Sequence, residues 1–300
     1  MNKRQKDKTV THTLSKATTI LLLIVIALMG ALNSPSSRAA HHEMDAATSA
    51  ALDAAIVGDH RSEANKARDK FRRPKETLAF FGFRSDMTVV EIWPGGGWYT
   101  EILAPALKDS GKLYAAQYSV NPSYGYQRRY FGAFLSKLGE NQKIYRDVEI
   151  TTLDFPYALA IAPAGTADMV LTFRNAHNWV NPGYGAQAAP LSFKVMFDAL
   201  KPGGVLGVVD HRWHDPKTED PKADDGYVSE ERIIALAKAA GFELAARSDM
   251  NRNSKDDHEH PQGVWTLPPS LALGDKDREQ YVAIGESDRM TLKFVKPAGK

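Results

Sequence analysis

The sequence contains no cysteine among its 300 residues. This absence excludes disulfide bonds, thiolate metal sites and thiol nucleophiles, so the chain must hold itself together by its hydrophobic core. It also excludes an anchor of the lipoprotein type, because such an anchor needs a cysteine to carry the lipid.

The sequence also lacks an apolar run long enough to span a bilayer comfortably. The longest run begins at Ile20, ends at Leu32 and holds thirteen residues, whereas a membrane-spanning helix needs about 20. Basic residues precede it, and Ser37 and Ala39 place small side chains where a signal peptidase requires them. We therefore expect residues 1–39 to be a cleavable signal peptide and the mature protein to be periplasmic or secreted, without stable membrane insertion. The alternative is an uncleaved N-terminal anchor.

The chain has no surplus of basic residues outside this leader. It holds 38 basic and 36 acidic residues, and the first 39 residues account for six of the bases but only one acid. The remaining chain is mildly acidic, which argues against a nucleic-acid partner.

Apolar segments alternate with helical patterns over most of the chain. A helical stretch over 40–85, with a charged part from Arg61 to Glu76, precedes them and could cap a pocket or form a solvated helix. Glycine-bounded apolar or β-branched runs then predict strands, and amphipathic segments between them predict helices. Such alternation implies an α/β fold with a parallel sheet covered on both faces. The predicted strands are 87–92, 112–117, 143–148, 168–173, 205–209, 242–246 and 291–295; the main predicted helices are 98–107, 130–138, 191–200 and 229–240; residues 201–204 predict a turn.

A glycine-rich loop follows the first predicted strand. In Glu91-Ile-Trp-Pro-Gly-Gly-Gly97, an acid ends the buried run, and Gly95, Gly96 and Gly97 open the next helix. Glycines let a ligand approach the backbone N–H groups of a helix N-terminus. The strand and helix on either side favour a ligand-binding loop over a purely structural turn.

From about Arg72 to Lys296 the chain resembles the class I SAM-dependent methyltransferases, and more narrowly a family of predicted bacterial methyltransferases that carry export signals. The matching strings are RPxETLxFFG at 73–82, EIWPGGGWYTEILAP at 91–105, LKPGG at 200–204, and NRNxxDD at 251–257 with HPxGVWTLPP at 260–269. The resemblance implies a three-layer, Rossmann-like domain over 86–300 with a mostly parallel seven-stranded sheet and an insertion at about 249–290.

The resemblance also implies S-adenosyl-L-methionine (SAM) as cofactor. Two residues depart from the pattern of the broad family. Trp93 takes the place of the first glycine of the glycine motif, and Gln117 takes the place of the acid that holds the ribose hydroxyls. The expected cofactor-binding residues are Glu91, Trp93, Gly95, Gly96, Gly97, Gln117 and Arg174.

Polar residues follow the fourth and fifth predicted strands, where a substrate would lie. Asn175 and His177 could orient a nucleophile or accept its proton, and His211 is a second general-base candidate. Asp210 could orient His211, but neighbours on a strand point to opposite faces, so the partner could come from another loop. The alternative is that these side chains only satisfy loop backbone.

The insertion contains His258 and His260 beside Asp256 and Asp257. Alternate histidines without a third ligand at a fixed spacing do not specify a metal site, so we expect no metal. A lid that closes the pocket, with Trp265 packed beneath it, is the favoured role. The whole pattern predicts an exported methyltransferase that acts on a small molecule or an envelope component. The alternative is a non-catalytic or repurposed ligand-binding protein on the same fold.

Overall fold

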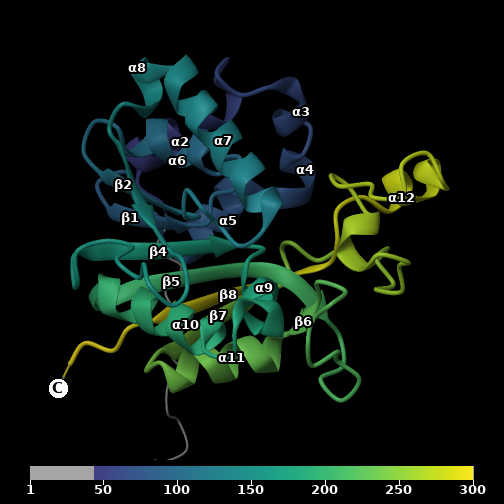
Figure 1. The fold of residues 1–300 in the computed structure, drawn as a ribbon. Coiled ribbons are helices and arrows are strands. Elements are labelled where there is room, and N and C mark those ends of the chain that lie inside the picture. The colour runs from purple at the N-terminus through teal and green to yellow at the C-terminus, as the bar shows by residue number, and fades with distance from the viewer. Residues whose placement is uncertain (1–43, 300) are drawn as a thin grey trace, which may run out of the picture. The chain divides into compact units, whose positions relative to one another are not determined.

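The sheet has seven strands in the order β3-β2-β1-β4-β5-β8-β7, and a short strand, β6, pairs with β5. All pairs are parallel except those of β8, which runs antiparallel to β5 and β7. The mostly parallel α/β sheet predicted from the sequence is therefore confirmed (Figure 1). The strands are β1 (Thr88–Ile92), β2 (Lys112–Gln117), β3 (Val148–Thr152), β4 (Ala167–Phe173), β5 (Leu200–Trp213), β6 (Val228–Ser229), β7 (Glu243–Ser248) and β8 (Arg289–Val295).

This computed structural model describes residues 44–299, which belong to one unit from His42 to Lys300. The predicted N-terminal cap helices are thus part of the same unit as the sheet. The predicted signal peptide at 1–39 lies outside the described residues. Within the described part, no helix is both long and apolar enough to cross a membrane.

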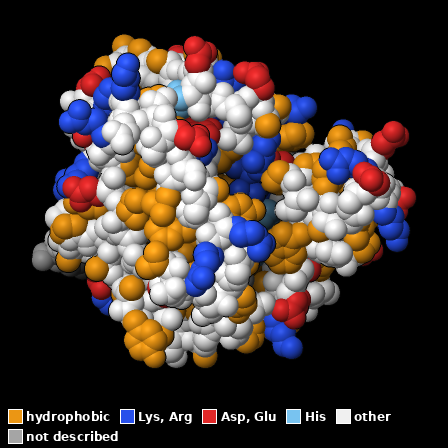
Figure 2. Space-filling view, turned by 45° about the horizontal axis from the view of Figure 1, so that its top comes forward, with side chains coloured by type: hydrophobic (Ala, Val, Ile, Leu, Met, Phe, Trp, Pro, Cys, Tyr) orange, Lys and Arg blue, Asp and Glu red, His pale blue; other side chains and the backbone are white. Residues whose placement is uncertain are grey.

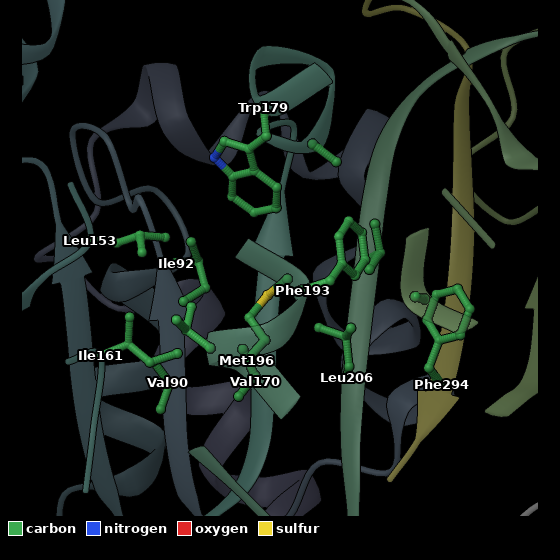
Figure 3. Close-up of a cluster of buried hydrophobic side chains, with 14 of the residues drawn as sticks. Val90, Ile92, Leu153, Ile161, Val170, Trp179, Phe193, Met196, Leu206 and Phe294 are labelled. Atoms are coloured by element: carbon green, nitrogen blue, oxygen red, sulfur yellow. The ribbon is translucent and has the colours of Figure 1, made fainter. Parts of the chain in front are cut away.

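Helices cover both faces of the sheet because its buried strands alternate their side chains between two cores. Val89 belongs to the core beneath α2, α5 and α6, whereas the next residue, Val90, belongs to the core beneath α10 and α11. Figure 3 shows Val90, Val170 and Leu206 of three strands pointing toward Met196 of α10. The helices are α2 (Ala46–Val57), α3 (Glu63–Lys66), α4 (Asp69–Arg72), α5 (Pro74–Phe81), α6 (Thr100–Leu107), α7 (Gly125–Glu140), α8 (Gln142–Tyr145), α9 (Ala176–Val180), α10 (Ala188–Ala199), α11 (Glu230–Ala239) and α12 (Arg278–Ile284), with 3-10 turns at Pro182–Tyr184 and Gly263–Thr266.

Two local predictions were wrong. The strand predicted at 143–148 is mostly the helical turn α8, and β3 begins only at Val148. Tyr145 is buried and belongs to this turn, and its backbone amide donates to the carbonyl of Asn141. The apolar character of residues 143–148 therefore reflects the packing of a helical turn. The turn predicted at 201–204 lies within β5, where it forms an irregularity in the pairing with β4. Ala167 pairs with Leu200, whereas Met169, two residues later, pairs with Val205.

The strand order reverses between β1 and β4, and ligands of open α/β sheets bind at the carboxyl edge near such a point. The loops after β1, β2, β4 and β5 open at this edge. The chain between β7 and β8, which includes α12, returns to it (Figure 1).

Candidate active site

A cavity of about 990 Å³ lies at the carboxyl edge of the sheet. Its walls come from the loops after β1, β2, β4 and β5, from α4 and α7, and from the insertion before β8. Figure 2 shows a hollow with basic and histidine side chains inside it, beside the lobe that contains α12. The volume suits a ligand of cofactor size together with a small substrate. Eight of the ten predicted site residues line it: Glu91, Trp93, Gly95, Gly96, Arg174, Asn175, His177 and His211.

The backbone at Trp93 has the conformation for which the glycine motif normally uses glycine at this position. Its φ of 44° lies in the left-handed region, which glycine adopts freely and other residues adopt at a cost of about 1–2 kcal/mol. The indole compensates through packing. It is 4% exposed, its Nε1 donates to the carbonyl of Leu153 at 2.8 Å, and its ring packs against Tyr118, Trp179 and Tyr184. Trp93 is therefore both a wall of the cavity and part of the core.

The glycines after Trp93 divide between ligand access and packing. Gly95 has a φ of 58°, and a Cβ there would meet no atom within 4 Å because the position faces the open cavity. Gly97 also has a positive φ, but its Cβ would lie 3.1 Å from Phe134, and Gly97 does not line the cavity. Gly95 thus exposes backbone to a ligand, whereas Gly97 lets α7 pack closely against the loop.

Gln117 has a supporting position and not the ligand contact that we expected. Its side chain is fully buried, donates from Nε2 to the carbonyl of Gly95 at 2.9 Å and accepts from the amide of Tyr118 at 3.0 Å. Both ends of the amide are therefore engaged, and Gln117 is not among the cavity-lining residues. The side chain fixes the glycine loop to the end of β2. This geometry corrects the expectation that Gln117 bonds ribose hydroxyls.

Glu91 is the second-last residue of β1 and lines the cavity. Its carboxylate is 2% exposed and accepts from the hydroxyl of Thr100 at 2.6 Å. Burial raises the pKa of Glu91 to about 7, although the Thr100 hydroxyl opposes that shift. The group is therefore close to half protonated at neutral pH, and it can donate a hydrogen bond as well as accept one.

His177, which lines the cavity, forms the most clearly oriented polar pair of the site with Asp210. Asp210 is fully buried within β5, and its Oδ1 lies 2.8 Å from Nδ1 of His177, which follows β4. The backbone amides of His177 and His211 also donate to this carboxylate, at 3.1 and 2.8 Å. A carboxylate can only accept, so Nδ1 of His177 carries the proton and Nε2 has the free electron pair. Nε2 lies 3.0 Å from Nδ2 of Asn178.

His211 has a different partner from the one that adjacency in sequence suggests. Its Nδ1 pairs with the hydroxyl of Ser287, which comes from the insertion, while its ring centroid lies 5.1 Å from that of His177. Burial, followed by His177 and nearby arginines, lowers the pKa of His211 well below its ordinary value. His211 is therefore neutral across the neutral pH range.

Asn175 and Arg174 both line the cavity, but only the Asn175 side chain is held by hydrogen bonds to other described residues. Asn175 uses its Nδ2 to bond the carbonyl of Ile92 at 2.8 Å and the hydroxyl of Thr172 at 3.2 Å, so it fastens the end of β4 to the end of β1. Arg174 makes no side-chain hydrogen bond or ion pair with another described residue. Burial lowers the pKa of Arg174, and the charge of Glu286 only partly offsets it.

A cluster of charged residues that we did not predict forms another wall. Arg68 and Arg72 of the cap bond Glu286 at 2.7 and 3.0 Å, and Arg289 bonds it at 3.0 Å. Burial raises the pKa of Glu286, but the surrounding arginines outweigh burial and hold it well below its ordinary value. The four-residue spacing of Arg68 and Arg72 was visible in the charged stretch, but the position of Glu286, 214 residues from Arg72, was not.

Two groups of residues have metal-ligating atoms within 4.8 Å of one another: His177 with Asp210 and His211, and Asp256 with Asp257 and His260. The first group faces arginines whose charge opposes a divalent cation. In the second, Asp256 already accepts from Tyr227, His260 and the amides of His258 and Asp288. In the first group, the hydrogen bond between Asp210 and His177 places the proton on the imidazole. In the second group, the hydrogen bonds of Asp256 anchor the insertion.

The insertion closes one side of the cavity. Trp265 of the insertion lines the cavity, is 39% exposed and lies with its ring 6.2 Å from that of His177. The buried Asp256 network holds the base of the insertion against β8. This arrangement fits the lid role that we expected for the segment, with Trp265 at the cavity wall.

No protein-family model matches the sequence, and no curated protein matches it. Among solved structures, the chain is similar to the [4+2]-cyclase SpnF, with a TM-score of 0.53 and 15% identity over 85% of this chain and 98% of that chain. It is also similar to a protein assigned as a sarcosine dimethylglycine methyltransferase from Galdieria sulphuraria, with a TM-score of 0.52 and 13% identity over 81% and 89% of the two chains. Identities this low establish the fold and not the reaction. The chain has the Rossmann-like fold of these proteins.

Proposed function

We propose that the protein is a SAM-dependent methyltransferase that acts on a small molecule or an envelope component. The observation that carries the proposal is that one cavity joins an open glycine loop to an oriented histidine–aspartate pair. The first feature is suited to an adenosyl ligand, and the second to a proton transfer. The fold that the chain shares with a methyltransferase supports the same reading.

The residues around Gly95 fit the cofactor. The open space above Gly95 admits a ligand against the backbone, and the amides that follow it precede α6. Gly95, Gly96, Trp93 and Glu91 would hold the cofactor, while Gln117 keeps the loop in place from behind. When bound, SAM would supply an electrophilic methyl group on its positively charged sulfur for transfer to the acceptor atom.

His177 would accept the proton that the acceptor atom loses. Its Nε2 has the free electron pair because Asp210 fixes the proton on Nδ1. An acceptor hydroxyl or amine would replace Asn178 as the hydrogen-bond partner of Nε2. Asp210 does not touch the substrate; it sets the tautomer and stabilises the imidazolium that forms. Trp265 and the insertion would exclude water from this side of the cavity.

We further propose that the protein is exported, as in the family of exported bacterial methyltransferases that its motifs resemble. The basic N-terminus, the thirteen-residue apolar run and the small residues before Ala40 support this. A fusion of residues 1–40 to a reporter that is active only outside the cytosol tests it. An active reporter is expected, and an inactive reporter would overturn export without affecting the proposed reaction.

Calorimetric titration of the full-chain protein with SAM and with S-adenosylhomocysteine tests the reaction. We expect both to bind with micromolar dissociation constants, as is usual for enzyme ligands. A protein that binds neither ligand at millimolar concentration would overturn the proposal.

A second candidate is a repurposed binding protein or an enzyme of another reaction. The strained Trp93 and the engaged Gln117 favour it, because both alter the usual cofactor contacts. The similarity to a cyclase shows that proteins of this fold carry other chemistry. Under this candidate a different ligand binds above Gly95, and SAM does not.

A further inference from the structure

The cavity holds more positive charge than its own acids neutralise. Arg68, Arg72, Arg174 and Arg289 all act on the single carboxylate of Glu286. Both carboxylate oxygens are occupied, since Oε1 accepts from Arg68 and Arg72 while Oε2 accepts from Arg72 and Arg289. Three positive charges therefore remain without a carboxylate in the cluster.

Several guanidinium donors in this wall have no hydrogen-bond partner among residues 44–299. Nη2 of Arg68 and Nη2 of Arg72 are buried and make no hydrogen bond with a described residue. The Arg72 side chain as a whole is 2% exposed. The guanidinium of Arg174 makes no hydrogen bond with another described residue. A buried donor without a partner costs about 1–3 kcal/mol, and more when it is charged. Arg68, Arg72 and Arg174 all line the cavity.

The same arginines lie close to the proposed base. Arg174, Arg289 and Arg72 all lower the pKa of His211, whose ring lies 5.1 Å from that of His177. The planar guanidinium group binds carboxylate and phosphate oxygens through paired hydrogen bonds.

We propose that the substrate carries an anionic oxygen group, a carboxylate or a phosphate, that binds between Arg68, Arg72 and Arg174 beside the two histidines. The anion would give the Arg174 guanidinium a hydrogen-bond partner and offset the surplus charge. This inference rests on the proposed function and names the chemical class of its substrate.

Arg174 is the residue to test because its side chain makes no hydrogen bond with any other described residue that its removal would break. Inorganic phosphate and sodium acetate would be titrated into the full-chain protein by calorimetry. We expect millimolar binding of at least one anion, a loss of tenfold or more in R174Q, and recovery of most of the affinity in R174K. R247Q, which removes an exposed arginine outside the cavity, should bind as the wild type does. The melting temperature of R174Q should be unchanged or higher, since the variant relieves repulsion.

A second titration separates a substrate site from the carboxylate of the cofactor. We assign Arg174 to the substrate, whereas the resemblance implies a cofactor contact. Phosphate or acetate should therefore still bind when the protein is saturated with S-adenosylhomocysteine. Loss of anion binding in the saturated protein would overturn the inference, because the arginines would then hold the amino-acid end of the cofactor. So would equal anion binding by wild type and R174Q, or none by wild type. If S-adenosylhomocysteine fails to bind but the R174Q effect appears, the proposed function falls and the anion site stands.

Discussion

Asp210 of β5 and His177, which follows the neighbouring strand β4, are 33 residues apart, and their side chains meet at 2.8 Å behind the cavity wall that His177 forms. The carboxylate also accepts two backbone amides, so it is fixed before any substrate arrives. This pair makes Nε2 of His177 the basic atom.

D210N should reverse the tautomer of His177. The new amide can donate to Nδ1, which moves the ring proton to Nε2 and removes the free electron pair from the cavity side. The ¹⁵N chemical shifts of the imidazole measure this, with the signal assigned by its loss in H177Q. An unchanged tautomer in D210N would show that Asp210 does not set the protonation of His177.

E91Q should change the pH dependence of stability. Glu91 titrates near 4.5 in the unfolded chain and at about 7 when buried, so its cost in the folded state grows as pH rises through this window. Each pKa unit corresponds to about 1.4 kcal/mol, so the wild type should lose up to about 3 kcal/mol relative to E91Q between pH 4.5 and pH 7.5. Urea unfolding across this range measures the difference. Parallel stability curves for the two proteins would contradict the raised pKa of the buried Glu91 carboxyl.

E286Q should destabilise the fold by about 3–5 kcal/mol, because it leaves buried guanidinium groups without their counter-charge. The stabilisation by Glu286 is present above pH 4.5 and is lost as pH falls further, since its folded pKa lies well below its ordinary value. The double variant E286Q/R174Q should regain part of the loss in denaturant unfolding. A double variant less stable than E286Q would mean that Arg174 is not repelled by the cluster.

W93G should lose stability by a net of about 1–4 kcal/mol. Removing a buried tryptophan costs about 3–5 kcal/mol, and relief of the left-handed backbone returns about 1–2 kcal/mol. The indole contributes packing against Tyr118, Trp179 and Tyr184 that glycine cannot replace. Urea unfolding measures the change. A stabilised W93G would show that the strain outweighs the packing; tighter binding of SAM by W93G would indicate that the indole restricts the cofactor.

The strands and the glycine loop could be predicted because their signals are local. The apolar run before Glu91 and the glycines after it specify a strand, a loop and a helix without distant contacts. Residues 143–148 were misassigned because a buried helical turn and a short strand have similar apolar content over six residues.

The polar partnerships could not be predicted because they depend on tertiary contacts. Asp210 was considered as a partner for its neighbour His211, but the strand directs it to His177, and Ser287 from the insertion reaches His211 instead. Gln117 fits a ribose contact by position alone, and only its two occupied hydrogen bonds reveal the supporting role. The arginines around Glu286 come from the cap (Arg68 and Arg72), from the loop after β4 (Arg174) and from the start of β8 (Arg289). No local sequence pattern connects these segments.

A matched pair of glycine variants tests the central claim, that an adenosyl ligand binds against the loop at Gly95. Gly95 and Gly165 have φ values of 58° and 66°, and a Cβ on either would meet no atom within 4 Å, but only Gly95 lines the cavity. Calorimetric titration with S-adenosylhomocysteine should show wild-type affinity for G165V and a loss of a hundredfold or more for G95V, while both variants lose similar stability. Equal affinity of G95V and G165V would contradict the claim.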